Sequence, residues 1–229
     1  MDKVVWLVAG NKGGVGKSAV AKAVVEWLQS HETPVIVVDG DKRTPDVHQA
    51  FSELLVTEKF DLNDEMGWPL FSDFLCETDF TGHIVANLPD GISDRAILYF
   101  QRLERLALGY NFEVKVLFVL NTLPDGLHLF DRLSESFKAV YPIKNLCFGA
   151  PADFEHFDVT FAVRYEGKVV LFPKMNTRIM SLVRESGMPF QQFAEQTGDA
   201  KTNFSYAKLV VADWRDSMIE ALDEVLLGE

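Results

Sequence analysis

The chain has 229 residues, of which 48% are hydrophobic, and a formal net charge of −12 at pH 7. This size and composition predict one domain, residues 1–229, with enough apolar residues for a full α/β core. The acidic balance disfavours a broad basic face for DNA. Cys76 and Cys147 stand at no metal-ligand spacing, and we expect no leader or membrane-spanning run. The sequence therefore predicts a cytoplasmic protein without a membrane anchor.

Short apolar runs alternate with helical patterns along the chain. The expected strands are residues 4–10, 35–39, 83–89, 114–121, 143–149 and 168–173. They are apolar at nearly every position, which is typical of strands that are covered on both faces. The expected helices are residues 17–30, 45–55, 94–108, 127–140, 176–186 and 206–227, with a short one near 70–76. This alternation predicts an α/β fold with a doubly wound, mostly parallel sheet and helices on both faces.

A glycine-rich loop, residues 10–16, joins the first expected strand to the first expected helix. It matches the end of the pattern G-x-x-x-x-G-K-[ST] but has Asn11 at the first glycine position. In such a phosphate-binding loop, glycines turn backbone amides toward a phosphate, a lysine neutralises the phosphate, and a serine hydroxyl binds Mg²⁺. The candidate nucleotide-binding residues here are Gly13, Gly14, Val15, Gly16, Lys17 and Ser18.

The segment K-G-G-V-G-K-S, residues 12–18, resembles the deviant Walker A motif of the ParA/MinD superfamily of dimerising ATPases, which share the CobQ/CobB/MinD/ParA nucleotide-binding domain. The resemblance implies ATP and Mg²⁺ as ligands and a nucleotide-dependent homodimer. It also implies that Lys12 acts catalytically, as a cation supplied to the partner's phosphates. A protein partner or cargo adaptor follows from the same resemblance, with a plasmid or mobile element as one cargo.

Polar residues follow the second and third expected strands, at the sheet edge where α/β proteins bind ligands. Asp39 and Asp41 form a D-x-D pair. The resemblance implies that Asp41 orients the attacking water or contacts the metal region, and that Ser18 and Asp39 belong to the metal site. Asn87 occupies the third metal position, where the family has an aspartate. Because a neutral amide holds Mg²⁺ less strongly, we expect slow hydrolysis, with Asp90 close enough in sequence to compensate.

Two later strand ends carry candidates for base recognition. The resemblance implies that Asn121 and Pro173 frame the adenine, although either residue also suits the start of a turn. The last expected helix is amphipathic, and its polar face is acidic. Anionic lipid would repel that face, so we expect this helix to dock on the rest of the chain.

Two alternatives to a switch ATPase remain open from the sequence. One is an ATP-gated adaptor with little hydrolysis, favoured by Asn87, and another is a small-molecule ligase or kinase of the dethiobiotin synthetase type. Bacterial tyrosine kinases share the pattern D-x-D-x-R-x-P, residues 39–45. Those kinases carry a tyrosine cluster in the tail, whereas the five tyrosines here are scattered, which disfavours that reading.

Overall fold

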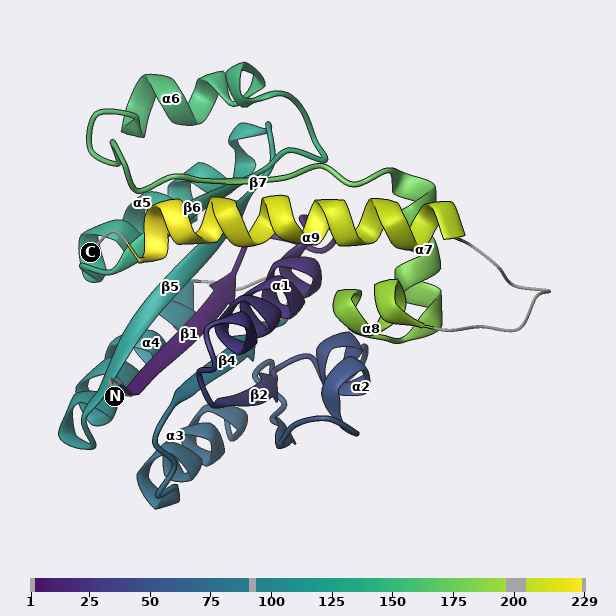
Figure 1. Ribbon diagram of the computed structural model, residues 1–229. Helices are drawn as coiled ribbons and strands as arrows, with labels where there is room; N and C mark the ends of the chain where they lie inside the picture. Colours follow the sequence, from purple (N-terminus) through teal and green to yellow (C-terminus); the bar gives the residue numbers. More distant parts are fainter. Residues whose placement is uncertain (1–2, 91–93, 197–204, 228–229) are drawn as a thin grey trace.

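The computed structural model describes residues 3–90, 94–196 and 205–227. Within them, seven parallel strands form one sheet in the order β3-β2-β4-β1-β5-β6-β7 (Figure 1). The predicted doubly wound parallel sheet is confirmed. The strands are β1 (Lys3–Ala9), β2 (Val35–Asp39), β3 (Thr57–Lys59), β4 (His83–Asn87), β5 (Phe112–Leu120), β6 (Val140–Asn145) and β7 (Val170–Phe172).

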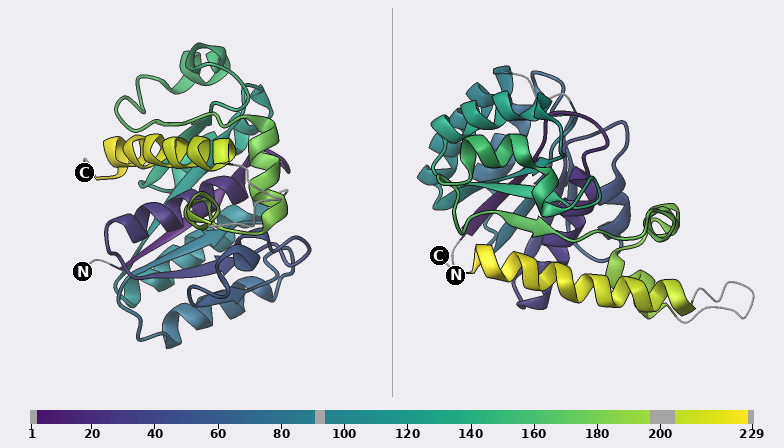
Figure 2. Two further views of the ribbon diagram at one scale, coloured as in Figure 1. Left: turned by 45° about the vertical axis from the view of Figure 1, so that its right-hand side comes forward. Right: turned by 90° about the horizontal axis from the view of Figure 1, so that it is seen from above.

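Helices cover both faces of the sheet, as the view from above in Figure 2 shows. One face of the sheet is covered by α1 (Lys17–Ser30), α2 (Asp46–Phe51), α7 (Thr177–Ser186), α8 (Phe190–Glu195) and α9 (Ser205–Leu226). The other is covered by α3 (Gly67–Glu77), α4 (Asp94–Gly109), α5 (Leu127–Ser136) and α6 (Glu155–Phe161). Successive β1 residues face the two layers alternately, with Trp6 in the first core and Leu7 in the second.

Several elements differ from the sequence prediction. The expected helix over residues 127–140 ends at Ser136, and β6 begins at Val140 and ends at Asn145 instead of spanning 143–149. Val140 pairs with Val116 of β5, so sheet pairing determines this boundary. Proline is tolerated at position 142 because β7, the next strand, pairs only with residues 143–145. The short elements β3, α6 and α8 were not predicted.

The C-terminal helix α9 docks on the sheet layer, as expected. Its residues Val211, Met218 and Leu222 are fully buried, and the Trp214 indole N–H donates to the carbonyl oxygen of Pro173 over 2.9 Å. Among the described helices, none combines the length and the apolar character needed to cross a membrane.

A buried ion pair joins α1, α8 and α9. Glu26 is 1% exposed; one of its carboxylate oxygens accepts from Arg215 Nε at 2.8 Å and the other from the backbone N–H of Gln191 at 3.0 Å. Arg215 also donates to the Gln191 side chain at 3.1 Å. Burial raises the pKa of Glu26 above its ordinary value, and the hydrogen bonds from Gln191 and Arg215 oppose that rise.

Replacing Arg215 by Met leaves Glu26 buried without its cation, and we expect a loss of about 3–5 kcal/mol of unfolding free energy at neutral pH. Because the folded-state pKa of Glu26 is raised, the penalty grows as pH rises through that pKa and shrinks in mild acid, where the carboxylate is protonated. Urea unfolding at acidic and neutral pH measures both effects. Glu26→Gln in the same variant serves as the control and should remove the pH dependence; a deficit independent of pH in Arg215→Met alone would contradict the assignment.

Candidate functional site

The phosphate-binding loop runs from the end of β1 to the start of α1. Its glycines Gly14 and Gly16 have φ angles of 77° and 104°, values that side-chain-bearing residues rarely adopt. No described side chain caps the first turn of α1, so the backbone amides there remain available to an anion. The local sequence thus builds a loop and helix terminus of the kind that binds phosphate.

Asn145, the last residue of β6, forms a hydrogen bond to this loop from two strands away in the sheet. It is 3% exposed, and its side-chain amide donates to the carbonyl oxygen of Val15 at 2.9 Å. A Cβ atom on Gly16 would lie 2.3 Å from the same amide nitrogen. Gly16 is therefore required both by its φ angle and by the close approach of Asn145.

The two lysines of the loop contact different carboxylates. Lys17, 6% exposed, donates to Asp90 at 2.5 Å and to the carbonyl oxygen of Lys12 at 3.0 Å. Lys12 instead pairs with Asp125, which follows β5 in the short helix η1 (Pro124–Gly126), also at 2.5 Å. The hydrogen bond from Lys12 lowers the pKa of the Asp125 carboxyl. Of these two lysines, Lys17 lines the cavity beside the loop, whereas Lys12 is directed toward Asp125.

Asp39, at the end of β2, organises the neighbouring loop from a fully buried position. One carboxylate oxygen accepts from the backbone N–H groups of Val47 and His48, in the first turn of α2. The other accepts from the backbone N–H of Asp41 at 3.2 Å and from the Asn87 side-chain amide at 3.1 Å. Burial raises the pKa of Asp39, and these four hydrogen bonds oppose the rise.

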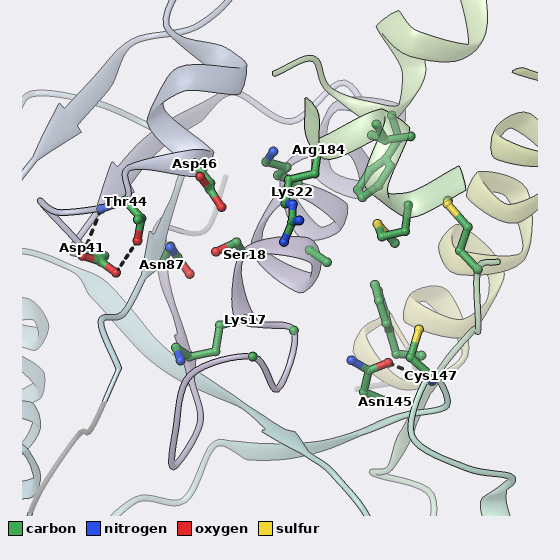
Figure 3. Close-up of a pocket in the computed structure, with 18 of the residues that line it drawn as sticks. Lys17, Ser18, Lys22, Asp41, Thr44, Asp46, Asn87, Asn145, Cys147 and Arg184 are labelled. Atoms are coloured by element: carbon green, nitrogen blue, oxygen red, sulfur yellow. Dashed lines mark hydrogen bonds between the residues drawn. The ribbon is translucent and has the colours of Figure 1, made fainter. Parts of the chain in front are cut away.

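Asp41 lines the cavity, but its carboxylate is engaged in its own turn. One oxygen accepts from the backbone N–H groups of Arg43 and Thr44, and the other accepts from the Thr44 hydroxyl at 2.9 Å (Figure 3). The carboxylate accepts three hydrogen bonds in this turn, which leaves an acceptor site on its second oxygen for a water.

The residues present fit a magnesium ion that depends on a bound phosphate. Asn87 is 2% exposed, and its side-chain oxygen is buried without a hydrogen-bond partner among the described residues. Ser18 contributes a hydroxyl to the same cavity. Oxygen atoms of this kind suit Mg²⁺, which usually retains waters and takes further ligands from phosphates. In the described part of the chain, no three His, Cys, Asp or Glu side chains gather as a metal site.

A cavity of about 420 Å³ extends from the loop, a volume within the range of small-molecule sites. Its polar end is formed by the loop, Ser18 and the acidic residues after β2 and β4 (Figure 3). Its far end lies between α1, α7 and α8. That end is lined by apolar side chains of Phe172, Met175, Met180, Val183 and Phe190.

Two solved structures with bound nucleotide share this fold. The septum site-determining protein MinD from Pyrococcus horikoshii, solved with Mg-ADP, superposes with a TM-score of 0.58 at 15% identity, over 95% of this chain and 97% of that one. A nucleotide-binding protein from Archaeoglobus fulgidus, solved with ADP, gives a TM-score of 0.56 at 15% identity, over 88% and 92%. The chain has the fold of MinD.

The protein MobD from Acidithiobacillus ferrooxidans is 29% identical over 185 residues, which cover 78% of this chain and 81% of MobD. No family model matches the chain.

The site residues predicted from the sequence differ in whether they line the cavity. Gly14, Gly16, Lys17, Ser18, Asp41 and Asn87 line the cavity, and Asp39 lies behind Asn87. Gly13 borders Asp90, and Val15 is buried and bonded to Asn145.

The two residues expected to frame the base are not among the described residues that line the cavity. The side-chain oxygen of Asn121 accepts from the backbone N–H of Leu123, and Pro173 supplies its carbonyl oxygen to Trp214. Asn145 and Phe172, at the ends of β6 and β7, line the cavity instead. The sequence prediction ended this strand at residue 149, so Asn145 was not recognised as a strand-end residue. Its position at the end of a strand is the signal that could have identified it.

Changing Asn87 to Asp places a second carboxylate against buried Asp39, which Asn87 now contacts at 3.1 Å. We expect a loss of about 3 kcal/mol of unfolding free energy near pH 8. Like-charge repulsion raises the pKa of the two neighbouring carboxyls. The stability loss therefore diminishes as pH falls through that raised pKa and one carboxyl is protonated. Urea unfolding at two pH values measures it, and added Mg²⁺ should restore stability.

The control is Asn121→Asp, because a carboxylate accepts the Leu123 N–H as well as an amide does. Its stability should change little with pH or Mg²⁺. If both variants lost the same unfolding free energy with the same dependence on pH, the contact between Asn87 and Asp39 would not be the cause of the loss.

Proposed function

We propose that the chain is an ATP- and Mg²⁺-binding switch ATPase of the ParA/MinD type that dimerises with nucleotide and positions, partitions or helps transfer a cargo. The observation that carries this proposal is the uncapped start of α1, with Lys17 and Ser18 facing a cavity of nucleotide size. The ADP-bound and Mg-ADP-bound proteins of the same fold support it.

In this proposal the loop amides, Lys17 and Ser18 hold the phosphates, and the apolar far end of the cavity receives the base. The Ser18 hydroxyl and the Asn87 oxygen would hold Mg²⁺, which supplies charge neutralisation at the phosphates. Asp41 orients the attacking water through the acceptor site that its own turn leaves free. Because Asn87 is neutral and Asp41 is engaged, hydrolysis is slow, which also makes the ATP-gated adaptor a second candidate. Sustained phosphate release would exclude the adaptor.

In this proposal Lys12 serves a neighbouring subunit, and its exposure supports that role. It is 42% exposed and directed toward Asp125, away from the chain's own cavity. Lys17, in contrast, is buried against its own loop. A division of labour follows, with Lys17 binding the nucleotide of its own chain and Lys12 contacting that of the partner.

We expect Lys12→Ala to bind a non-hydrolysable ATP analogue normally but to remain monomeric, because the cation supplied to the partner is lost. Lys17→Ala should lose tenfold or more in affinity, the usual range for a charge-assisted hydrogen bond to phosphate. Calorimetry and light scattering after size-exclusion chromatography measure the two effects. Identical behaviour of both variants would refute the division of labour.

Asp90 competes with phosphate for Lys17, so Asp90→Asn should raise affinity for ADP. The pair is half exposed on the Asp90 side, which limits the gain to roughly twofold to fivefold. Asp125→Asn is the matched control: it frees Lys12 and should leave the ADP affinity of the monomer unchanged. Weaker ADP binding by Asp90→Asn would show instead that this carboxylate belongs to the nucleotide-bound site.

A further inference from the structure

The cavity continues past the phosphate-binding loop along one face of α1. Lys22 lies four residues after Ser18, one helical turn further on, and both residues line the cavity. Arg184 of α7 also lines this cavity. In Figure 3, both cationic side chains lie beyond Ser18 as seen from Lys17.

Lys22 is unusual because it is buried without a partner. It is 6% exposed and makes no hydrogen bond or ion pair with any described residue. Desolvation lowers its pKa, and the nearby carboxylates of Asp46, Asp39 and Glu26 oppose that change. The Nζ atom is not among the fully buried side-chain atoms without a partner, so the ammonium reaches the cavity that Lys22 lines and its donors face the space there.

The nearby carboxylates do not satisfy Lys22. Asp39 accepts four hydrogen bonds from other groups, and Glu26 is bonded to Arg215 and Gln191. Asp46 lines the cavity and acts on Lys22 only through its charge. The ammonium donors of Lys22 therefore remain available to a group in the cavity.

Arg184 adds a second cation that is free among the described residues. It sits in the last turn of α7, and its side chain is exposed. Two cations that line one cavity repel one another, and an anion bound by both removes that repulsion. A guanidinium and an ammonium together offer a fork and a point charge for oxygen acceptors.

We propose that Lys22 and Arg184 form an anion-binding subsite, separate from the phosphate-binding loop, for a carboxylate or phosphate group of a ligand in this cavity. The group belongs either to the bound nucleotide or to a second small molecule held beside it. The subsite itself depends only on the cavity and its two cations.

The test uses Lys22→Met and Arg184→Met, since Met preserves most of the side-chain volume of Lys. The matched control is Lys144→Met, because Lys144 is equally buried but pairs with Asp158 at 2.5 Å. Without ligand, Lys22→Met should melt at the same temperature as the wild type or higher, whereas Lys144→Met should melt lower. A purely structural Lys22 would give the opposite result for Lys22→Met, which would overturn the proposal.

Binding of inorganic phosphate is measured by calorimetry in a Lys17→Ala background, which removes the main cation of the loop. We expect phosphate to bind there at millimolar concentrations, and adding Lys22→Met or Arg184→Met to weaken it tenfold or more. Lys22→Arg should retain binding. Phosphate affinity that neither Met substitution changes, or no phosphate binding in the Lys17→Ala background, overturns the proposal.

Two further titrations identify the source of the anion. If it belongs to the nucleotide, Lys22→Met in the otherwise native chain weakens ATP binding. If it belongs to a second molecule, ATP affinity is unchanged and phosphate binding to the ADP-loaded protein is weakened. A native chain that fails to bind ATP would defeat the proposed function, while the phosphate titrations would still decide the subsite.

Discussion

The hydrogen bond from Asn145 to Val15 is the constraint on which the site depends. It connects the end of β6 to the phosphate-binding loop after β1, two strands away in the sheet. Because Asn145 also approaches Gly16 closely, the loop is fixed by the sheet as well as by its own glycines. The shape of an anion site made from backbone amides is thereby set before any ligand arrives, so little conformational entropy remains to be lost on binding.

Charge is distributed around this loop in a way that suits exchange of ligands. Each loop lysine has a carboxylate partner from a different strand end, Asp90 after β4 and Asp125 after β5. These carboxylates are about half exposed, so they are weakly bound and readily displaced. In a chain with an overall charge of −12, these two partly exposed carboxylates neutralise the two loop lysines.

The sequence predicted the parallel sheet, because apolar strands that are covered on both faces have a distinctive pattern, and it predicted the phosphate-binding loop from its glycines. It did not predict Asn145, because sheet pairing of Val140 determines where β6 begins and hence where it ends. Lys22 was also missed, since a lysine on a helix is ordinarily solvated and only tertiary packing buries this one. Contacts between distant segments, such as Lys12 with Asp125, leave no local signal in the chain.

Polar groups without a hydrogen-bond partner lie around Asp39, whereas the buried charges of Glu26 and Lys144 are paired. The two buried side-chain atoms without partners in the described chain belong to Asn87 and His48, and both residues donate a hydrogen bond to Asp39. Lys22, also unpartnered, lies within electrostatic reach of the same carboxylate. Glu26 and Lys144, equally buried, have full partners. Since native proteins satisfy nearly all buried polar groups, the Asn87 oxygen and the Lys22 ammonium, which belong to residues lining the cavity, are the groups that a bound ligand would complete.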